Sequence, residues 1–436
     1  ARMKWLALVA LATVASAIPD MFMGRRRGGF TSHLFENVDS SILAMSDAWT
    51  GNITQRLDHF DDSITATWTQ RYMFNHDYAN SNVNILYLSG EQWMINPIVG
   101  PAAYVYYAEQ LSADLYALEH RFYGKSQPTE DTSVENLKYL SSRQAIEDIA
   151  EFIRQINKVK GGDQKWILVG GSYAGALSAW ARLKHPELIA GSIASSGPVL
   201  AQMDFYGYLQ TVDEDFKKVG GLCYDQISAG LEAAQQLLQS DEGRKTLTKT
   251  FKISPPLSDY DVLSPYDIDT FYSYLISQFE GAAQYSQPPI NALCEKFTAN
   301  GPDYDPLKAF YSILSPAEKL NFNVNYKESV VELSGTEFQG DISMRLWFYQ
   351  TCAEFGYFQS TNRGTNVFGQ TQSSNSFIEY CVQLFGINVD QIEKNIEATN
   401  AYYGERDYYA GTNVIFSHGT QDPWSFLTKK SDPKHW

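Results

Sequence analysis

Residues 166–180, WILVGGSYAGALSAW, carry the strongest indication of the fold in this chain. An apolar run ends in two glycines, Ser172 follows, and small residues then open a helix-forming segment. Small residues two positions before and two positions after the serine, here Gly170 and Ala174, are typical of a nucleophile elbow. This sharp strand-to-helix turn presents a serine hydroxyl above a sheet. The backbone N–H of Tyr173, at the positive end of the helix dipole, is then expected to stabilise an oxyanion.

Further apolar runs predict the sheet that this elbow belongs to. Runs of four to eight apolar residues bounded by Gly, Asn or Asp are typical of strands buried on both faces. They lie at residues 84–90, 114–121, 166–171, 189–197 and 413–419. Residues 63–75 alternate and predict an earlier antiparallel strand, and residues 142–159 carry one apolar helical stripe. Strands alternating with helices predict an α/β fold with a parallel sheet.

This alternation stops near Phe205 and resumes only after about Asn400. The segment between is helical and irregular, so an α/β core interrupted by a mostly helical cap is the simplest architecture. The cap is expected to cover the carboxyl ends of the strands, where such sheets bind ligands. The predicted parts are a signal peptide at 1–17, a flexible N-terminal tail at 18–50, the first part of the core at 51–204, the cap at 205–400, and the second part of the core at 401–436.

The first residues predict secretion. Lys4 precedes an apolar run from Trp5 to Val14, and Ala15-Ser16-Ala17 forms a small-residue cleavage site. This run is shorter than the roughly 20 apolar residues that span a membrane, and no other segment qualifies, so no membrane association is expected. The net charge of −16 argues against a nucleic-acid partner, because phosphate binding requires clustered Lys and Arg.

Because secreted proteins fold in an oxidising compartment, the four cysteines are expected to form two disulfides. Three connectivities are possible, and loop length favours Cys223 with Cys294 and Cys352 with Cys381. Their spacing is too wide for a structural zinc site, so no metal or cofactor is expected. The sequon Asn52-Ile53-Thr54 predicts a glycosylated surface.

A triad acid is expected after a later strand. Asp422 follows the run at 413–419, and Pro423 stops the strand there. Hydrolases with a nucleophile elbow use the order Ser, acid, His, so the base should follow on a loop after one further strand. A helix and a strand need more than the fourteen residues left after Asp422, so His435 comes too early.

The expected base therefore lies beyond Trp436, and the residues Ala1 and Arg2 before Met3 also suggest an incomplete chain. Losing the base of a comparable triad costs on the order of 10⁶ in turnover, so the chain as printed is expected to be almost inert. The other histidines do not fit the position of the triad base, and we expect them to have structural or local roles. They are His33, His59, His76, His120, His185 and His418.

Several long motifs resemble the proline-specific serine exopeptidases, a family that includes lysosomal prolyl carboxypeptidase and dipeptidyl peptidase II. They are QRLDHFDDS, LEHRFYGKSQP, GGSYAGALSAWARLKHPELIAGSIASSGPV, QTCAEFGYFQS and HGTQDPW. The resemblance runs from about residue 52 to 424 and is strongest to the thymus-specific serine protease branch. It implies an α/β-hydrolase core with a helical cap, a Ser, Asp, His triad with Ser172 and Asp422, and cleavage near a peptide terminus, often after proline. Where the family usually has Asn, this chain has His418.

The resemblance also implies residues around the substrate. Glu91 matches an acidic residue beside the active site, and the loop 90–93 is where a second oxyanion donor, from Glu91 or Gln92, is expected. Tyr357 and Phe358 lie in a cap motif near the substrate pocket, where either one contacts a proline ring or packs in the core. The expected activity is that of a secreted or lysosomal serine exopeptidase acting on peptides. An esterase and a binding protein that has lost the base are the alternatives, and the sequence does not indicate an oligomeric state.

Overall fold

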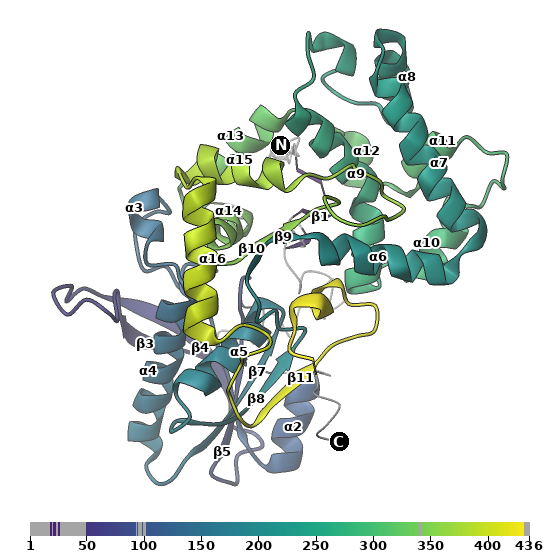
Figure 1. Cartoon of the computed structure of the whole chain (residues 1–436). Helices are drawn as coiled ribbons and strands as arrows, with labels where there is room; N and C mark the ends of the chain where they lie inside the picture. Colours follow the sequence, from purple (N-terminus) through teal and green to yellow (C-terminus); the bar gives the residue numbers. More distant parts are fainter. Residues whose placement is uncertain are drawn as a thin grey trace, which may run out of the picture.

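The computed structural model describes residues 18–19, 21–22, 25–26, 49–92, 94, 98, 102–339 and 342–430. The predicted signal peptide lies outside these residues. Figure 1 shows a twisted sheet with a mostly helical segment, coloured teal to green, packed at one end of it.

A seven-stranded mixed sheet forms the core, with strand order β11-β8-β7-β5-β6-β4-β3. β3 pairs antiparallel with β4 and β4 with β6, whereas the other neighbours are parallel. Each of the five predicted runs contains a strand, and the α/β-hydrolase class is confirmed. The strands are β3 (Thr50–Arg56), β4 (Thr67–Asn75), β5 (Val83–Leu88), β6 (Asp114–Leu118), β7 (Lys165–Gly171), β8 (Ile189–Ser195) and β11 (Val414–Ser417).

Helices cover both faces of this sheet because its central strands are apolar on both sides. Ile85 and Leu115 pack on one face with α2 (Ala103–Leu111), whereas Leu86 and Leu168 face α4 (Ser142–Lys160) and α5 (Tyr173–Lys184). The predicted stripe of α4 is buried at Ala145, Ile149, Phe152 and Ile153 and half-buried at Ile156. A short helix, α3 (Val134–Leu137), precedes α4.

The segment between β8 and β11 is mostly helical, and Figure 1 shows it gathered beyond one edge of the sheet. A short parallel pair, β9 (Gln202–Phe205) with β10 (Gly356–Gln359), runs through it. Its helices are α6 (Tyr206–Val219), α7 (Gly221–Leu238), α8 (Asp241–Phe251), η2 (Leu257–Asp259), α9 (Pro265–Tyr285), α10 (Ile290–Phe297), α11 (Pro306–Ile313), α12 (Pro316–Leu320), α13 (Tyr326–Ser334), α14 (Ser343–Gln350), the π-helical turn η3 (Thr351–Phe355), α15 (Ser374–Phe385) and α16 (Val389–Tyr403). After β11 comes the 3₁₀ turn η4 (Pro423–Leu427).

Both favoured disulfides are present. Cys223 of α7 is bonded to Cys294 of α10, and Cys352 of η3 is bonded to Cys381 of α15. The first bridge joins residues 71 apart and the second joins residues 29 apart, so both close loops within the helical segment.

The described part of residues 18–50 does not behave as a solvated tail. Met21 and Phe22 are buried, and the Phe22 ring packs 5.4 Å from the ring of Phe348 on α14. Arg25 is also buried, and its guanidinium donates to the Ser343 carbonyl at 2.9 Å. The sequence interpretation missed these contacts because they form with helices that lie hundreds of residues away.

Candidate active site

Ser172 sits at a strained turn between β7 and α5. Its backbone has φ 58° and ψ −133°, a conformation that costs a non-glycine residue on the order of 1–3 kcal/mol and that clusters at functional sites. The Ser172 N–H donates to the Ser195 carbonyl at 2.9 Å, and the Ser172 carbonyl accepts from the Ala176 N–H at 3.1 Å. These bonds hold the turn, and the half-buried serine stands at the carboxyl end of β7.

Close backbone approach explains the small residues around the serine. A Cβ added to Gly170 would lie 2.1 Å from the Ala174 carbonyl oxygen, and one added to Gly175 would lie 2.6 Å from the Ser195 carbonyl oxygen. Ala174 replaces the usual second glycine, and its methyl group fits because Gly90 faces it. A Cβ at Gly90 would come within 2.9 Å of the Ala174 Cβ.

Glu91 is the polar neighbour of the nucleophile. The Ser172 hydroxyl donates to Glu91 Oε1 at 3.2 Å. Burial raises the pKa of Glu91, while the nearby Arg25 guanidinium, the Glu91 N–H and the Ser172 hydroxyl act in the opposite direction. Sequence reasoning missed Arg25 because no motif marks it, whereas the structure brings its charge to the carboxyl group that contacts Ser172.

Asp422 lies at the same sheet edge as Ser172. In the ladder, Gly171 of β7 pairs with Ser195 of β8, which pairs with Ser417 of β11, so Ser172 and Asp422 both follow the aligned ends of strands. One strand separates β7 from β11, which places the strand axes about 10 Å apart.

One oxygen of Asp422 is held and the other is unpaired. Oδ1 accepts from the Trp424 N–H at 3.0 Å at the start of η4. Oδ2 is buried and, among the described residues, receives no hydrogen bond. Burial raises the pKa of Asp422, and the Ser196 side chain and the Trp424 N–H offset part of this effect. A carboxylate with one anchored and one vacant oxygen is suited to orient an imidazole.

No described histidine hydrogen-bonds to Ser172 or Asp422. His120 is buried between the Tyr173 hydroxyl and the Arg121 carbonyl, and burial lowers its pKa to about 4. The remaining contacts are His59 with Asp148, His76 with Asp114, His185 with Glu147, and the exposed His418 with the Gly419 carbonyl. His33 and His435 lie outside the described residues.

Tyr173, Tyr357 and Phe358 have buried side chains. The Tyr173 hydroxyl accepts from Gln350 of α14 at 2.9 Å, so its ring ties α5 to the helical segment while its N–H opens the helix. Tyr357 is 1% exposed and donates to the Pro198 carbonyl, and Phe358 is 0% exposed and stacks on Phe377. Both Tyr357 and Phe358 therefore pack in the core, which was the alternative to contact with a proline ring.

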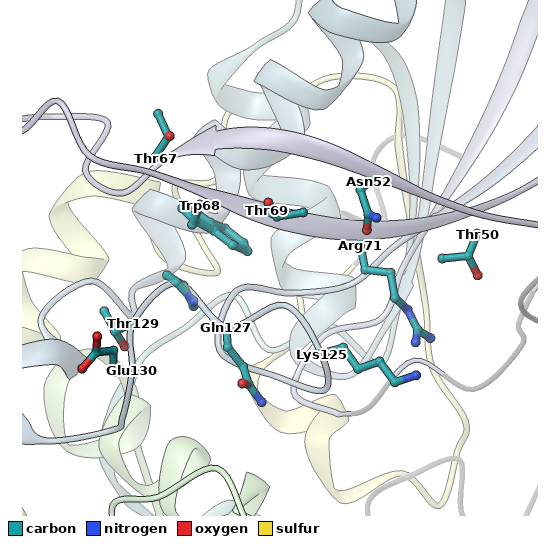
Figure 2. A pocket seen from close by; sticks show the side chains of 11 residues that line it. Thr50, Asn52, Thr67, Trp68, Thr69, Arg71, Lys125, Gln127, Thr129 and Glu130 are labelled. Atoms are coloured by element: carbon teal, nitrogen blue, oxygen red, sulfur yellow. The ribbon is translucent and has the colours of Figure 1, made fainter.

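The groove in Figure 2 is a separate feature. It has a volume of about 710 Å³ and lies between the outer face of β3 and β4 and the loop that carries Lys125 and Gln127. The exposed Asn52 of the sequon lines it, opposite Arg71 in the strand register. Neither Ser172 nor Asp422 lines this groove.

Neither a metal site nor a membrane-spanning helix is found in the described part of the chain. Among the described residues, no group of three or more His, Cys, Asp or Glu side chains is placed to hold a metal ion. In the same part of the chain, no helix is both long enough and apolar enough to cross a bilayer.

Comparison with known proteins identifies the family of this chain. The model of the serine carboxypeptidase S28 family matches residues 55–435. A putative serine protease of Caenorhabditis elegans is 34% identical, covering 94% of this chain and 84% of the relative. Mouse thymus-specific serine protease is 29% identical (88% and 78% covered), and human lysosomal Pro-X carboxypeptidase is 28% identical (85% and 76% covered). The chain therefore belongs to the serine carboxypeptidase S28 family.

Proposed function

We propose that this protein is a serine exopeptidase that hydrolyses peptides near a terminus, at proline-containing sites, through an acyl-enzyme on Ser172. The observation that carries the proposal is the strained elbow, which holds the Ser172 hydroxyl at the sheet edge where Asp422 keeps a vacant oxygen. The family supplies the class of substrate, since its members are serine peptidases. The proline preference rests on the similarity to the Pro-X carboxypeptidase named above.

In the proposed reaction, a base removes the Ser172 proton as the hydroxyl oxygen attacks the scissile carbonyl. The Tyr173 N–H, at the N-terminus of the twelve-residue helix α5, stabilises the oxyanion. Asp422 holds the base by accepting its N–H at Oδ2. Glu91 accepts from the Ser172 hydroxyl and so fixes its rotamer before substrate binds.

We place the triad base outside the described residues. The half-buried His59 bonds to Asp148 and the buried His120 bonds to Tyr173, and none of the described histidines bonds to Asp422. The vacant Oδ2 predicts that an imidazole N–H occupies this position in the active protein. Two disulfides and a lysosomal relative support our proposal of a secreted or lysosomal location.

Covalent labelling of the full-length protein with a fluorophosphonate tests the nucleophile. We expect Ser172→Ala to abolish labelling. Ser195→Ala is the matched control, because its hydroxyl lies at the same sheet edge and the carbonyl that holds Ser172 is retained. Equal labelling of Ser172→Ala and the parent would refute the proposal. Cleavage of proline-containing peptides, followed by mass spectrometry, tests the specificity, and turnover of a simple acyl ester without peptide cleavage would indicate an esterase.

A further inference from the structure

Glu280 is a buried carboxyl group that has no partner within the described part of the chain. It lies in α9, is 8% exposed, and makes no hydrogen bond or ion pair with any described residue. The buried carboxylate Asp148, by contrast, is held by the Arg121 guanidinium at 2.6 Å. Buried charges are normally paired, since an uncompensated one is costly. An isolated carboxyl group kept in this position is therefore a candidate for binding a cation that arrives with a ligand.

The helix that carries Glu280, α9, contacts the turn that follows Asp422. α9 packs against α6 and against η4, the turn that begins directly after Asp422. Tyr208 of α6 lies between them: its hydroxyl donates to Gln284 Oε1, one turn after Glu280, at 2.6 Å, and its ring packs 6.0 Å from the ring of Trp424. Burial raises the pKa of this tyrosine well above its usual range, and the charges of Glu280, Tyr285 and Asp422 raise it further. Tyr208 therefore connects α9, the helix that carries Glu280, to the turn that follows Asp422; Figure 1 labels α9 and α6.

We propose that Glu280 binds the free α-ammonium group of the peptide substrate, so that the protein removes residues from the amino terminus. This inference rests on the proposed function, because it assigns a residue to substrate recognition at the same site. A carboxypeptidase would instead need an unbalanced cation to bind the terminal carboxylate. Arg25, a cation whose charge acts on the Glu91 carboxyl group, is balanced by that group.

Glu280 is suited to be neutral when no ammonium group is bound and charged when one is bound. Burial raises its pKa to about 8, so the empty site holds a proton near neutral pH. An arriving ammonium group favours the carboxylate and releases this proton. The charge of Glu280 acts on Tyr208 of α6, and Tyr285 and Asp422 act on the same tyrosine.

Calorimetric titration of the Ser172→Ala protein tests the proposal without requiring catalysis. The probe is the tripeptide Ala-Pro-Ala, compared with its N-acetylated form, its C-amide and N-acetyl-Lys-Pro-Ala. We expect N-acetylation to weaken binding by about 10- to 100-fold, the range for a hydrogen bond to a charged group, and C-amidation to have little effect. With Glu280→Gln added, the effect of acetylation should disappear. Titrations in two buffers should show proton release on binding, and Glu280→Gln should remove it.

Matched variants separate this role from a structural one. Glu354→Gln changes another buried carboxyl group, which Ser142 already satisfies, and should keep the preference for a free amino terminus. Glu280→Asp keeps the charge and should keep part of the preference. Equal binding of free and acetylated peptide, or an unchanged ratio in Glu280→Gln, would overturn the proposal. If N-acetyl-Lys-Pro-Ala regains the affinity that acetylation removes, Glu280 binds the lysine ammonium group of a side chain, and the proposal is also overturned.

Fluorophosphonate labelling separates the two proposals. The melting temperature of Glu280→Gln is expected to match that of the parent, which shows that the variant is folded. If Ser172→Ala still labels, the proposed function fails whatever the peptides do. If labelling depends on Ser172 and acetylation has no effect, the exopeptidase chemistry stands and only the role of Glu280 is lost.

Discussion

Replacing Gly170 by alanine should disable Ser172, whereas the same change at Gly171 should not. A Cβ at Gly170 would lie 2.1 Å from the Ala174 carbonyl oxygen and 2.4 Å from its carbon, although ordinary contacts begin at 3.4 Å. Both atoms belong to the backbone at the start of α5, so the turn cannot relax by rotating a side chain. The start of the helix must shift by about 1 Å, a displacement that costs a catalytic group on the order of 10²-fold in rate.

The expected loss of stability is small. Overpacking of this kind costs about 1–3 kcal/mol. Unfolding entropy is about 2.1 cal/mol/K per residue, so a protein of 436 residues should lose only roughly 1–3 °C in melting temperature. A large loss of function with a small change in melting temperature would therefore report a displaced serine in a folded protein.

The assay is the rate constant of fluorophosphonate labelling, measured on the full-length protein beside its melting temperature. Gly171→Ala is the matched control, because its Cβ would meet no atom within 4 Å, and it should label within about twofold of the parent. Unchanged labelling of Gly170→Ala would refute the reasoning, as would an equal loss in both variants.

Two further predictions concern stability and modification. Burial raises the pKa of Glu280 from 4.5 to about 8, so the folded state binds that proton more tightly than the unfolded chain does. The contribution of this proton to the free energy of unfolding is fully present below about pH 4.5. It declines by about 5 kcal/mol as the pH rises to 8. Urea unfolding of Glu280→Gln should show a shallower decline, and an equal decline would contradict this origin. In a secretory host, Asn52→Gln should migrate faster than the parent on a gel, and a glycosidase should remove the difference; a parent insensitive to glycosidase would exclude glycosylation at Asn52.

Local constraints account for what the sequence predicted well. The elbow could be recognised because close backbone approach restricts Gly170 and its neighbours to small side chains, and that restriction appears within a few consecutive residues. The five buried strands could be recognised because a strand covered on both faces must be apolar throughout. The disulfide pairs agreed with loop length, which is again a property of the chain itself.

Long-range packing decided the rest. The sequence of α9 shows one more glutamate on a helix, and only its packing against α6 and η4 makes Glu280 a buried, unpaired carboxyl group. Arg25 looked like part of a solvated tail, yet it lies beside Glu91, and Tyr357 and Phe358 became core residues. By itself the sequence determined the nucleophile turn and the core strands, because steric and apolar requirements act between near neighbours. Only the tertiary structure decided which charges are buried and which face the active site, because burial depends on segments that meet from distant parts of the chain.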